Sequence, residues 1–227
     1  MSDPTKDAAD FRSADGRALA ERLSLMVITD PGASGGPVAA AKAALEAGAP
    51  AVQLRWKDGA ARELLELAGE LRRATHDAGA LFLVNDRVDI ALAVGADGCH
   101  LGDDDIPLEA ARRIAPPGFI IGRSVDTPDE ARIAEAKGAT YVGMGPVFPT
   151  GSKSNVGAVV GEAGITAARA QVRIPIVAIG GIGAAEATGV ARAGADGIAV
   201  ISAVMHAPDP GAATRRLLEA VRMGKRS

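Results

Sequence analysis

Three polar side chains alternate with two large apolar ones in one short stretch of the chain, which reads Gln53, Leu54, Arg55, Trp56, Lys57. If this stretch continues a β-strand, alternate residues point to opposite faces, so Gln53, Arg55 and Lys57 share one face. Polar groups on one face of a central strand are costly without partners. They indicate a binding site for a polar ligand. The alternative is that Arg55 and Lys57 only reach solvent at a rim.

Acidic side chains follow two further predicted strands. Asp86 comes directly after Asn85, and Asp103, Asp104 and Asp105 follow one another. Neighbouring carboxylates repel one another unless a cation or solvent separates them. Asp86 and one of the later aspartates could share a Mg²⁺ ion that keeps several waters beside a diphosphate. Two simpler interpretations stay open: Asn85 and Asp86 as helix caps, and 103–105 as a solvated acidic loop.

Small and hydroxyl-bearing residues mark a third group of candidates. Thr150, Gly151, Ser152 and Lys153 follow one another in a loop, where they could cradle an anion with Lys153 as a point charge. A plain surface loop would have a similar composition. Further along the chain, glycines 180 and 181 and the segment 201–203 each follow an apolar run, where backbone N–H groups could approach a ligand.

Short apolar, β-branched runs that alternate with helical patterns must position these residues. Each run is typical of a buried strand, and the segments between them, such as 62–78 and 129–137, have helical periodicity. The predicted strands are 23–29, 51–57, 81–85, 97–101, 119–124, 140–145, 175–180 and 196–202.

A repeated tetrad supports this assignment. Gly-Ala-Pro-Ala at 48–51, Gly-Ala-Asp-Gly at 95–98, Gly-Ala-Thr-Tyr at 138–141 and Gly-Ala-Asp-Gly at 194–197 each lie between a predicted helix and a predicted strand. Glycine there supplies the left-handed cap of the helix. Four repeats of a βαβα unit predict a single (β/α)8 TIM barrel, 22–227, after a polar N-terminal tail, 1–21. A doubly wound open sheet is the alternative, although no GxGxxG follows the first strand.

In such a barrel the candidates converge, because functional residues collect where strands end. The loops after strands 7 and 8 form the usual phosphate site, which favours phosphate over a mere tight turn at Gly180-Gly181. The pattern therefore predicts two anionic groups at one mouth: one beside strands 2, 3 and 4 with a metal, and one beside strands 7 and 8. That geometry suits joining a diphosphate to a monophosphate.

Composition limits the surroundings of this site. The formal net charge of −3 gives no basic excess for nucleic acid or an anionic membrane. The lone Cys99 cannot form an internal disulfide, and the sequence contains no zinc-like Cys/His cluster. No apolar run reaches the ~18 residues of a membrane span, and the polar first residues are unlike a signal peptide. We therefore expect a cytoplasmic protein.

The motifs taken together resemble the thiamine-phosphate synthases, also called thiamine phosphate pyrophosphorylases. The resemblance covers about residues 23–205, in order, and rests on segments 52–55, 83–91, 95–98, 100–102, 141–150, 177–182 and 200–203. It implies an enzyme that joins hydroxymethylpyrimidine diphosphate to a thiazole phosphate, with release of diphosphate and a requirement for Mg²⁺. It also suggests a homodimer. The implied reaction is dissociative and needs no general base, so His100 is expected to shape the site rather than carry a proton.

The resemblance assigns roles residue by residue. The metal ligands would be Asp86 and Asp105, and the groups assigned to catalysis would be Arg55, Ser124 and Lys153. The pyrimidine diphosphate would be bound by Gln53, Arg55, Lys57 and Asn85. The junction between the substrates would be lined by Ser124, Thr150, Ser152 and Lys153. The thiazole phosphate would be received by Gly181, Ile201 and Ser202, largely through backbone amides.

The sequence departs from the family pattern at Trp56, Asp103 and Asp126, where Glu, Gln and His are common. We expect Trp56 to point outward and Asp126 to pair with Arg123. Two rival functions remain. A thiazole tautomerase would resemble 122–125, yet its His is replaced by Asp126 and it needs no metal set. A non-catalytic barrel that binds a phosphorylated metabolite would be expected to lose the metal pair or Lys153.

Overall fold

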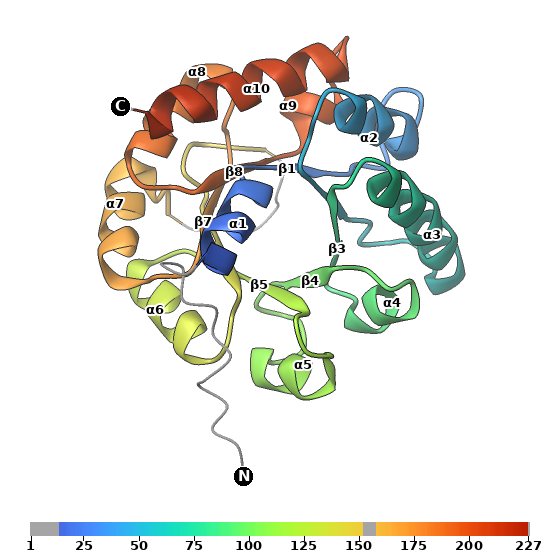
Figure 1. The fold of residues 1–227 in the computed structure, drawn as a ribbon, viewed down its shortest axis with the longest axis horizontal. Helices are drawn as coiled ribbons and strands as arrows, with labels where there is room; N and C mark the ends of the chain where they lie inside the picture. The colour runs from blue at the N-terminus through green and yellow to red at the C-terminus, as the bar shows by residue number, and fades with distance from the viewer. Residues whose placement is uncertain (1–13, 152–157, 227) are drawn as a thin grey trace.

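The computed structural model describes residues 14–151 and 158–226 of the chain. Within these residues, eight parallel strands pair in chain order, and β8 pairs back with β1 to close a barrel. A helix follows each strand and packs on its outer face (Figure 1). This is the single (β/α)8 barrel that the sequence predicts.

The strand positions agree closely with the predicted runs. The strands are β1 (Leu25–Ile28), β2 (Ala51–Leu54), β3 (Leu81–Asn85), β4 (Gly98–Leu101), β5 (Ile120–Val125), β6 (Tyr141–Met144), β7 (Ile176–Ile179) and β8 (Gly197–Val200). The largest difference is β2, which ends at Leu54 and not at Lys57. It ends there because the backbone N–H of Arg55 donates to Thr29 Oγ1 (3.0 Å), a side-chain acceptor, in place of a strand partner.

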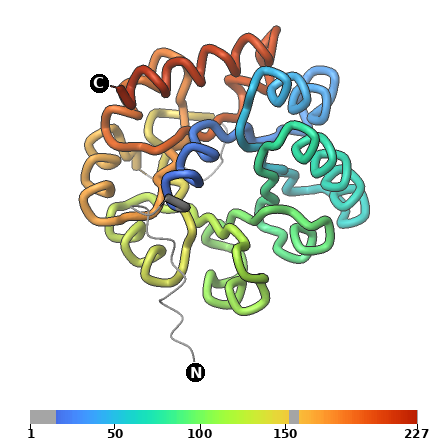
Figure 2. Tube along the Cα trace, in the orientation of Figure 1, coloured from blue at the N-terminus to red at the C-terminus, as the bar shows by residue number. Residues whose placement is uncertain are grey.

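The helices fill the intervals and complete the outer ring. They are α1 (Ala14–Arg22), α2 (Pro37–Glu46), α3 (Ala61–Asp77), α4 (Val88–Ala93), α5 (Leu108–Ile114), α6 (Pro128–Ala136), α7 (Gly161–Gln171), α8 (Ala184–Arg192), α9 (Ser202–Met205) and α10 (Pro210–Lys225). Helix α10 lies between α8 and α2, so the last helix joins the ends of the ring (Figure 2). No helix among the described residues has the length and apolar character needed to cross a bilayer.

Alternation along the strands separates two apolar layers. In β1, Leu25 and Val27 belong to the outer core between strands and helices, whereas Met26 and Ile28 belong to the core inside the barrel. Both faces of each strand are therefore buried, which explains why the strands read as continuous apolar runs. The inward-facing positions that carry polar side chains lie toward the carboxyl ends of the strands.

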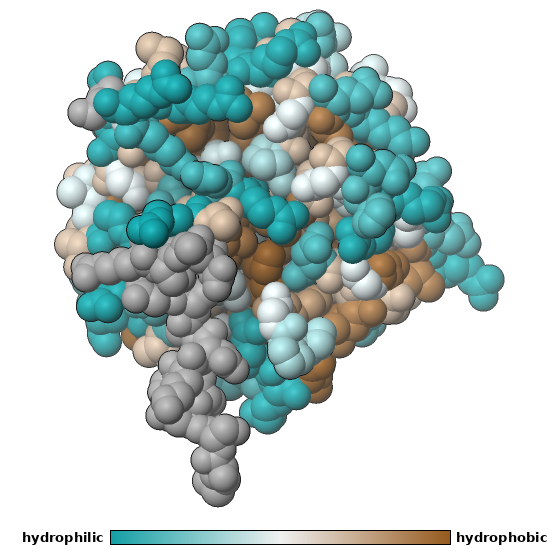
Figure 3. Space-filling view, viewed as in Figure 1, coloured by the Kyte–Doolittle hydropathy of each residue, from teal (hydrophilic) through white to brown (hydrophobic). Residues whose placement is uncertain are grey.

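Helix α1 covers the opposite, N-terminal opening of the barrel and lies across the middle of the ring in Figure 1. Leu19 packs against the inner core, and Ala20 and Leu23 are buried. The helix falls in the segment assigned from sequence to a polar tail, yet its apolar residues close this end of the barrel. On the same face, hydrophilic side chains dominate over the outer helices, and hydrophobic surface shows in patches between them (Figure 3).

The repeated tetrads mark a structural repeat at this N-terminal end. Their glycines, at 48, 95, 138 and 194, all have positive φ, between 62° and 108°, as expected for helix caps. In the last three tetrads the third residue accepts a hydrogen bond from the backbone N–H of a neighbouring strand: Asp97 from Phe82, Thr140 from Ile121 and Asp196 from Ile176. The first tetrad has Pro50 at this position and lacks such a side chain.

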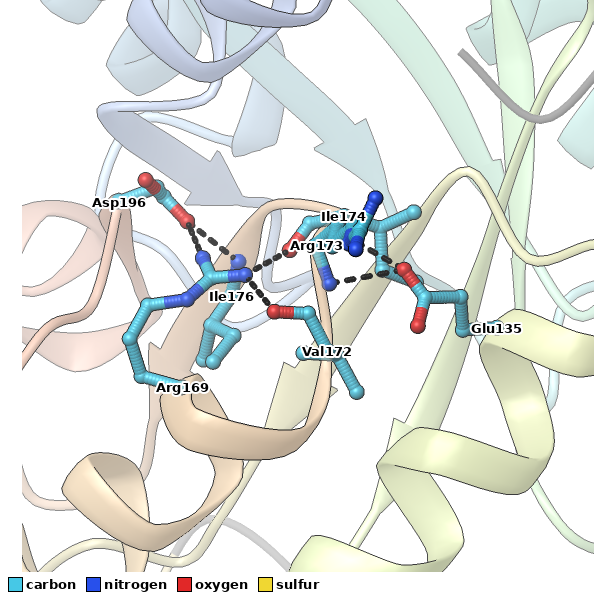
Figure 4. A network of polar contacts seen from close by, with 7 residues as sticks. All are labelled: Glu135, Arg169, Val172, Arg173, Ile174, Ile176 and Asp196. Carbon is cyan, nitrogen blue, oxygen red and sulfur yellow. Dashed lines mark hydrogen bonds and ion pairs between the residues drawn. The ribbon is translucent and has the colours of Figure 1, made fainter. Parts of the chain in front are cut away.

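Each of these three residues also contacts an arginine from the outer ring. The pairs are Arg72 with Asp97 (3.7 Å), Arg112 with Thr140 (3.0 Å) and Arg169 with Asp196 (2.9 Å), and we call them the arginine clamps. Figure 4 shows the third clamp, in which Arg169 also donates to the carbonyls of Val172 and Ile174. The clamps tie helices to strand starts and serve the fold.

Candidate functional site

A pocket opens at the carboxyl ends of the strands, and every strand contributes to its wall. It is lined by Met26, Ile28, Gln53, Arg55, Lys57, Asn85, Asp86, His100, Gly102, Ser124, Tyr141, Gly143, Val177, Ile179, Ala199 and Ile201. The apolar members form its floor inside the barrel, and the charged ones lie where the strands end. Seven of the residues singled out from sequence therefore share one cavity: Gln53, Arg55, Lys57, Asn85, Asp86, Ser124 and Ile201.

The wall after β2 carries the three alternating polar residues. Gln53, Arg55 and Lys57 face the pocket, while Leu54 and Trp56 pack in the outer core, as alternation predicts. Thr29, fully buried at the end of β1, holds the backbone of Arg55 through two hydrogen bonds. The Arg55 side chain thus starts from a backbone position that two neighbouring strands fix.

Asp86 occupies an unusual backbone conformation at the end of β3. Its φ is +64°, which an L-residue other than Asn or Asp rarely adopts and which is typical of functional positions. Its N–H donates to the His100 carbonyl (2.8 Å), and the Asn85 side chain donates to its Oδ1 (2.5 Å). Neither side chain caps α4, whose N-cap is Arg87 without a side-chain cap, so the capping interpretation is wrong.

Asp86 and Asp105 are neighbours at the mouth. Burial, and then the contact with Asp105, raise the pKa of Asp86 to about 6, against the opposing effect of Lys57 and Arg55. The Gly102 N–H donates to Asp105 Oδ2 (2.6 Å) and aims that carboxylate inward. Two carboxylates held against each other fit a hard divalent cation, whose charge would remove the repulsion. Among the described residues, no group of three or more metal-binding side chains exists.

Asp103 and Arg123 form an ion pair from the loop after β4 to β5, with an N···O distance of 2.5 Å. Arg123 also donates to the Gly102 carbonyl. Asp103 is thus an ion-pair partner of Arg123, and the expected pairing of Arg123 with Asp126 stays a prediction. The backbone N–H of Asp126 donates to Glu130 (2.7 Å).

The opposite side of the mouth is built by the ends of β6, β7 and β8. Gly180 and Gly181 have φ of +100° and +66°, and a Cβ on either would collide with residues 146–149. Glycine is therefore required at both positions, because the backbone has positive φ and because no space is left for a side chain. Ile201 lines the pocket, and Ser202 begins α9. Thr150 is half-buried in the loop that follows β6. The other two predicted residues of this loop, Ser152 and Lys153, lie outside the described residues.

The family model for thiamine monophosphate synthase matches residues 25–204. The chain belongs to this family. The resemblance inferred from sequence is thus confirmed.

The relatives match along most of their own length. A thiamine-phosphate synthase of Moorella thermoacetica is 51% identical over 199 residues, which cover 88% of this chain and 95% of that protein. One from Methanospirillum hungatei is 52% identical over 199 residues, covering 86% and 96%. Among solved structures, a thiamine phosphate pyrophosphorylase from Pyrococcus furiosus has a TM-score of 0.85 and 47% identity, covering 91% of this chain and 99% of that one.

Sequence reasoning did not single out Tyr141, which lines the pocket, Thr29, which holds the Arg55 backbone, or a contact between Asp30 and His206. Thr29 follows β1, so the rule that strand ends carry function could have found it. Tyr141 stands at the start of β6 with only 1% of its surface exposed, and only its inward position would have suggested a role. Asp30 Oδ2 and His206 Nε2 lie 2.9 Å apart and connect the loop after β1 to the end of α9. No sequence pattern indicates that these two distant segments meet.

Proposed function

We propose that this chain is a thiamine-phosphate synthase that joins hydroxymethylpyrimidine diphosphate to a thiazole phosphate, giving thiamine phosphate and diphosphate. The observation that carries the proposal is the Asp86–Asp105 pair beside Arg55 and Lys57 in one pocket. Two adjacent carboxylates beside cationic side chains suit a diphosphate that is bound together with a metal ion. The family membership supplies the substrates.

Asp86 and Asp105 would hold Mg²⁺, which when bound supplies positive charge to the departing diphosphate. Arg55 and Lys57 would bind the diphosphate oxygens from the β2 wall, with Asn85 at the end of β3. The buried amide of Gln53 would face the pyrimidine at the base of the pocket. These groups stabilise negative charge that grows as the diphosphate leaves, which is electrostatic catalysis.

The second substrate would enter from the other side of the mouth. Its phosphate would be received by Gly181, Ile201 and Ser202, and its ring nitrogen would capture the pyrimidine methylene carbon once the diphosphate has left. Ser124 and Thr150 would line the junction, together with Ser152 and Lys153 of the same loop. In this dissociative order no general base is needed, because the attacking nitrogen carries no proton to remove.

A turnover assay with each substrate omitted in turn tests this function. We expect diphosphate release only with both substrates and Mg²⁺, and none after chelation of the metal. Isomerisation of a thiazole carboxylate phosphate without diphosphate release would instead indicate a tautomerase. Binding of a phosphorylated compound without turnover would indicate a non-catalytic barrel. Either result would overturn the proposal.

We further propose that the enzyme acts in the cytoplasm as a homodimer. The buried thiol of Cys99, whose pKa burial raises to about 12, is unreactive and is compatible with a reducing compartment. Sedimentation of the purified chain tests the dimer, since a single species of 22.9 kDa would exclude it.

A further inference from the structure

A line of hydrogen-bonding side chains crosses the interior of the barrel below the pocket. It runs from Tyr141 on β6 to His100 on β4 and on to Ser124 on β5. The two ring nitrogens of His100 lie 2.8 Å from the Tyr141 hydroxyl and 2.9 Å from Ser124 Oγ. Which way the hydrogen bonds point decides whether Ser124 offers its proton to the histidine or to the pocket.

Glycines on the neighbouring strands make room for this line. A Cβ at Gly143 would lie 2.8 Å from His100 Cε1, and a Cβ at Gly122 would overlap the Tyr141 ring. Tyr141 is almost fully buried, and the rings of Tyr141 and His100 lie 5.5 Å apart. Both rings are therefore held in place by contacts that leave little freedom to reorient.

The hydroxyl of Tyr141 determines the direction in which these hydrogen bonds are donated. Burial raises the pKa of Tyr141 well above its usual range, so the phenol keeps its proton. Among the described residues, that proton has two acceptors in reach: His100 Nδ1 at 2.8 Å and the weakly accepting Met26 sulfur at 4.0 Å. A buried donor left without a good acceptor is costly, so the hydroxyl donates to Nδ1. The Gln53 amide nitrogen donates to the Met26 sulfur (3.2 Å).

The hydrogen bond at Nδ1 determines which nitrogen of His100 carries the ring proton. When Nδ1 accepts, a neutral histidine carries its proton on Nε2. Nε2 then donates to Ser124 Oγ, and the Ser124 hydroxyl proton is left to point into the pocket.

We infer that Tyr141 and His100 are positioning residues that fix Ser124 as a hydrogen-bond donor toward substrate. The partner of Ser124 would then be an acceptor atom, such as a ring nitrogen or a diphosphate oxygen. This inference rests on the proposed function only for the kinetic effect, since the proton position on His100 is a property of the free protein.

Nitrogen-15 NMR of the full chain without substrates tests the proton position directly. The chain has three histidines, and the His100→Gln variant identifies the signals of His100. We expect a bare Nδ1 and a protonated Nε2. A proton on Nδ1, or on both nitrogens, would overturn the inference even if the enzyme turns over as proposed. The expected spectrum without any turnover would instead leave the inference intact and count against the proposed function.

Kinetics of three variants test the consequence for Ser124. Tyr141→Phe keeps the ring and removes the donor, so we expect mixed histidine tautomers and a single-turnover rate about tenfold lower, the scale of one hydrogen bond. Affinity for inorganic diphosphate should fall by no more than the same factor of about ten, and only if a diphosphate oxygen is the acceptor for Ser124. In a Ser124→Ala background, Tyr141→Phe should add almost nothing, because both act through one group. Independent, multiplying effects would contradict the inference.

A matched control separates this effect from loss of stability. Thr214→Val removes another fully buried hydroxyl, which donates to the Pro210 carbonyl (2.8 Å) on α10, away from the pocket. It should destabilise the fold yet leave both the His100 spectrum and the rate of the folded protein unchanged. If Tyr141→Phe does not fold, the spectrum of the unsubstituted protein decides alone.

Discussion

At the N-terminal end of the barrel, Asp196 accepts hydrogen bonds from Arg169 and from a strand N–H, whereas at the mouth Asp86 lies against a second carboxylate, Asp105. Burial raises the pKa of both groups. At Asp196 the Ile176 N–H and Arg169 work against burial, while at Asp86 the contact with Asp105 adds to it. The first arrangement is complete within the protein, whereas the second would, under the proposed function, be completed by a cation. The same residue type thus stabilises the fold at one end and, as proposed, takes part in the chemistry at the other.

The largest effect is expected at the mouth, from Lys153, which the family resemblance places beside the departing diphosphate. Lys153→Ala should lower the single-turnover rate by about 10²–10³, the typical loss for one preorganised charge-stabilising group. Affinity for the thiazole phosphate should change less than about tenfold, because backbone amides would bind that phosphate. Single-turnover kinetics and equilibrium binding on the same variant check this. An unchanged chemical rate with weaker binding would remove Lys153 from the mechanism.

Removing either carboxylate of the metal pair comes next. Asp86→Asn or Asp105→Asn should lower turnover by roughly 10² or more, as expected for loss of a charge that holds a catalytic ion. The metal-free fold should be as stable as before, or more so, because one of two repelling carboxylates is gone. Turnover at saturating Mg²⁺ and urea unfolding of the metal-free protein measure both. Asp104→Asn, an exposed neighbour in the same loop, is the control and should change neither.

The opposite pattern is expected at the arginine clamps. Asp196→Ala removes one acceptor of Arg169 and the side-chain acceptor of the Ile176 N–H, so the free energy of unfolding should fall by about 2–3 kcal/mol. Turnover per folded molecule should not change. Asp97→Ala is the matched comparison: its clamp is longer, at 3.7 Å, and more exposed, so the loss should be about 1 kcal/mol. A clamp variant that folds normally but loses catalysis would break the division between the two ends.

The sequence could predict features that local patterns encode, but it could not predict contacts that depend on the folded chain. The glycine tetrads and the period-two alternation at 53–57 are local patterns, and they placed the strands, the helix caps and the β2 wall correctly. The interior line through Tyr141 and His100 depends on inward glycines at 122 and 143, whose effect exists only once strands are paired. The Asp103–Arg123 pair depends on the path of a loop. Lys153 stays a prediction from sequence.

The pH dependence of stability should follow from Asp86. Its folded-state pKa is about 6 against an ordinary value of 3.8, so between these pH values the folded state binds more protons than the unfolded one. Without metal, the contribution of Asp86 to stability is therefore greatest below about pH 4 and is lost as pH rises toward 6. Urea unfolding across this range should show the fall, and Asp86→Asn should flatten it. Mg²⁺ should restore stability mainly at the higher pH. A fall that persists in Asp86→Asn would assign it to another group.

The smallest effect is expected from Asp103, and it tests the assignment of the metal ligand. Asp103 is 80% exposed in its ion pair with Arg123, and exposed pairs contribute about 0–1 kcal/mol. Asp103→Asn should therefore leave unfolding nearly unchanged and alter turnover less than about threefold, well below the effect of Asp105→Asn. Both variants are compared by turnover at several Mg²⁺ concentrations, because loss of a ligand raises the metal requirement and loss of a surface pair does not. If Asp103 proved essential and Asp105 silent, the family motif would be misplaced by two positions, and the inward aim of Asp105 from the Gly102 N–H would serve only the loop.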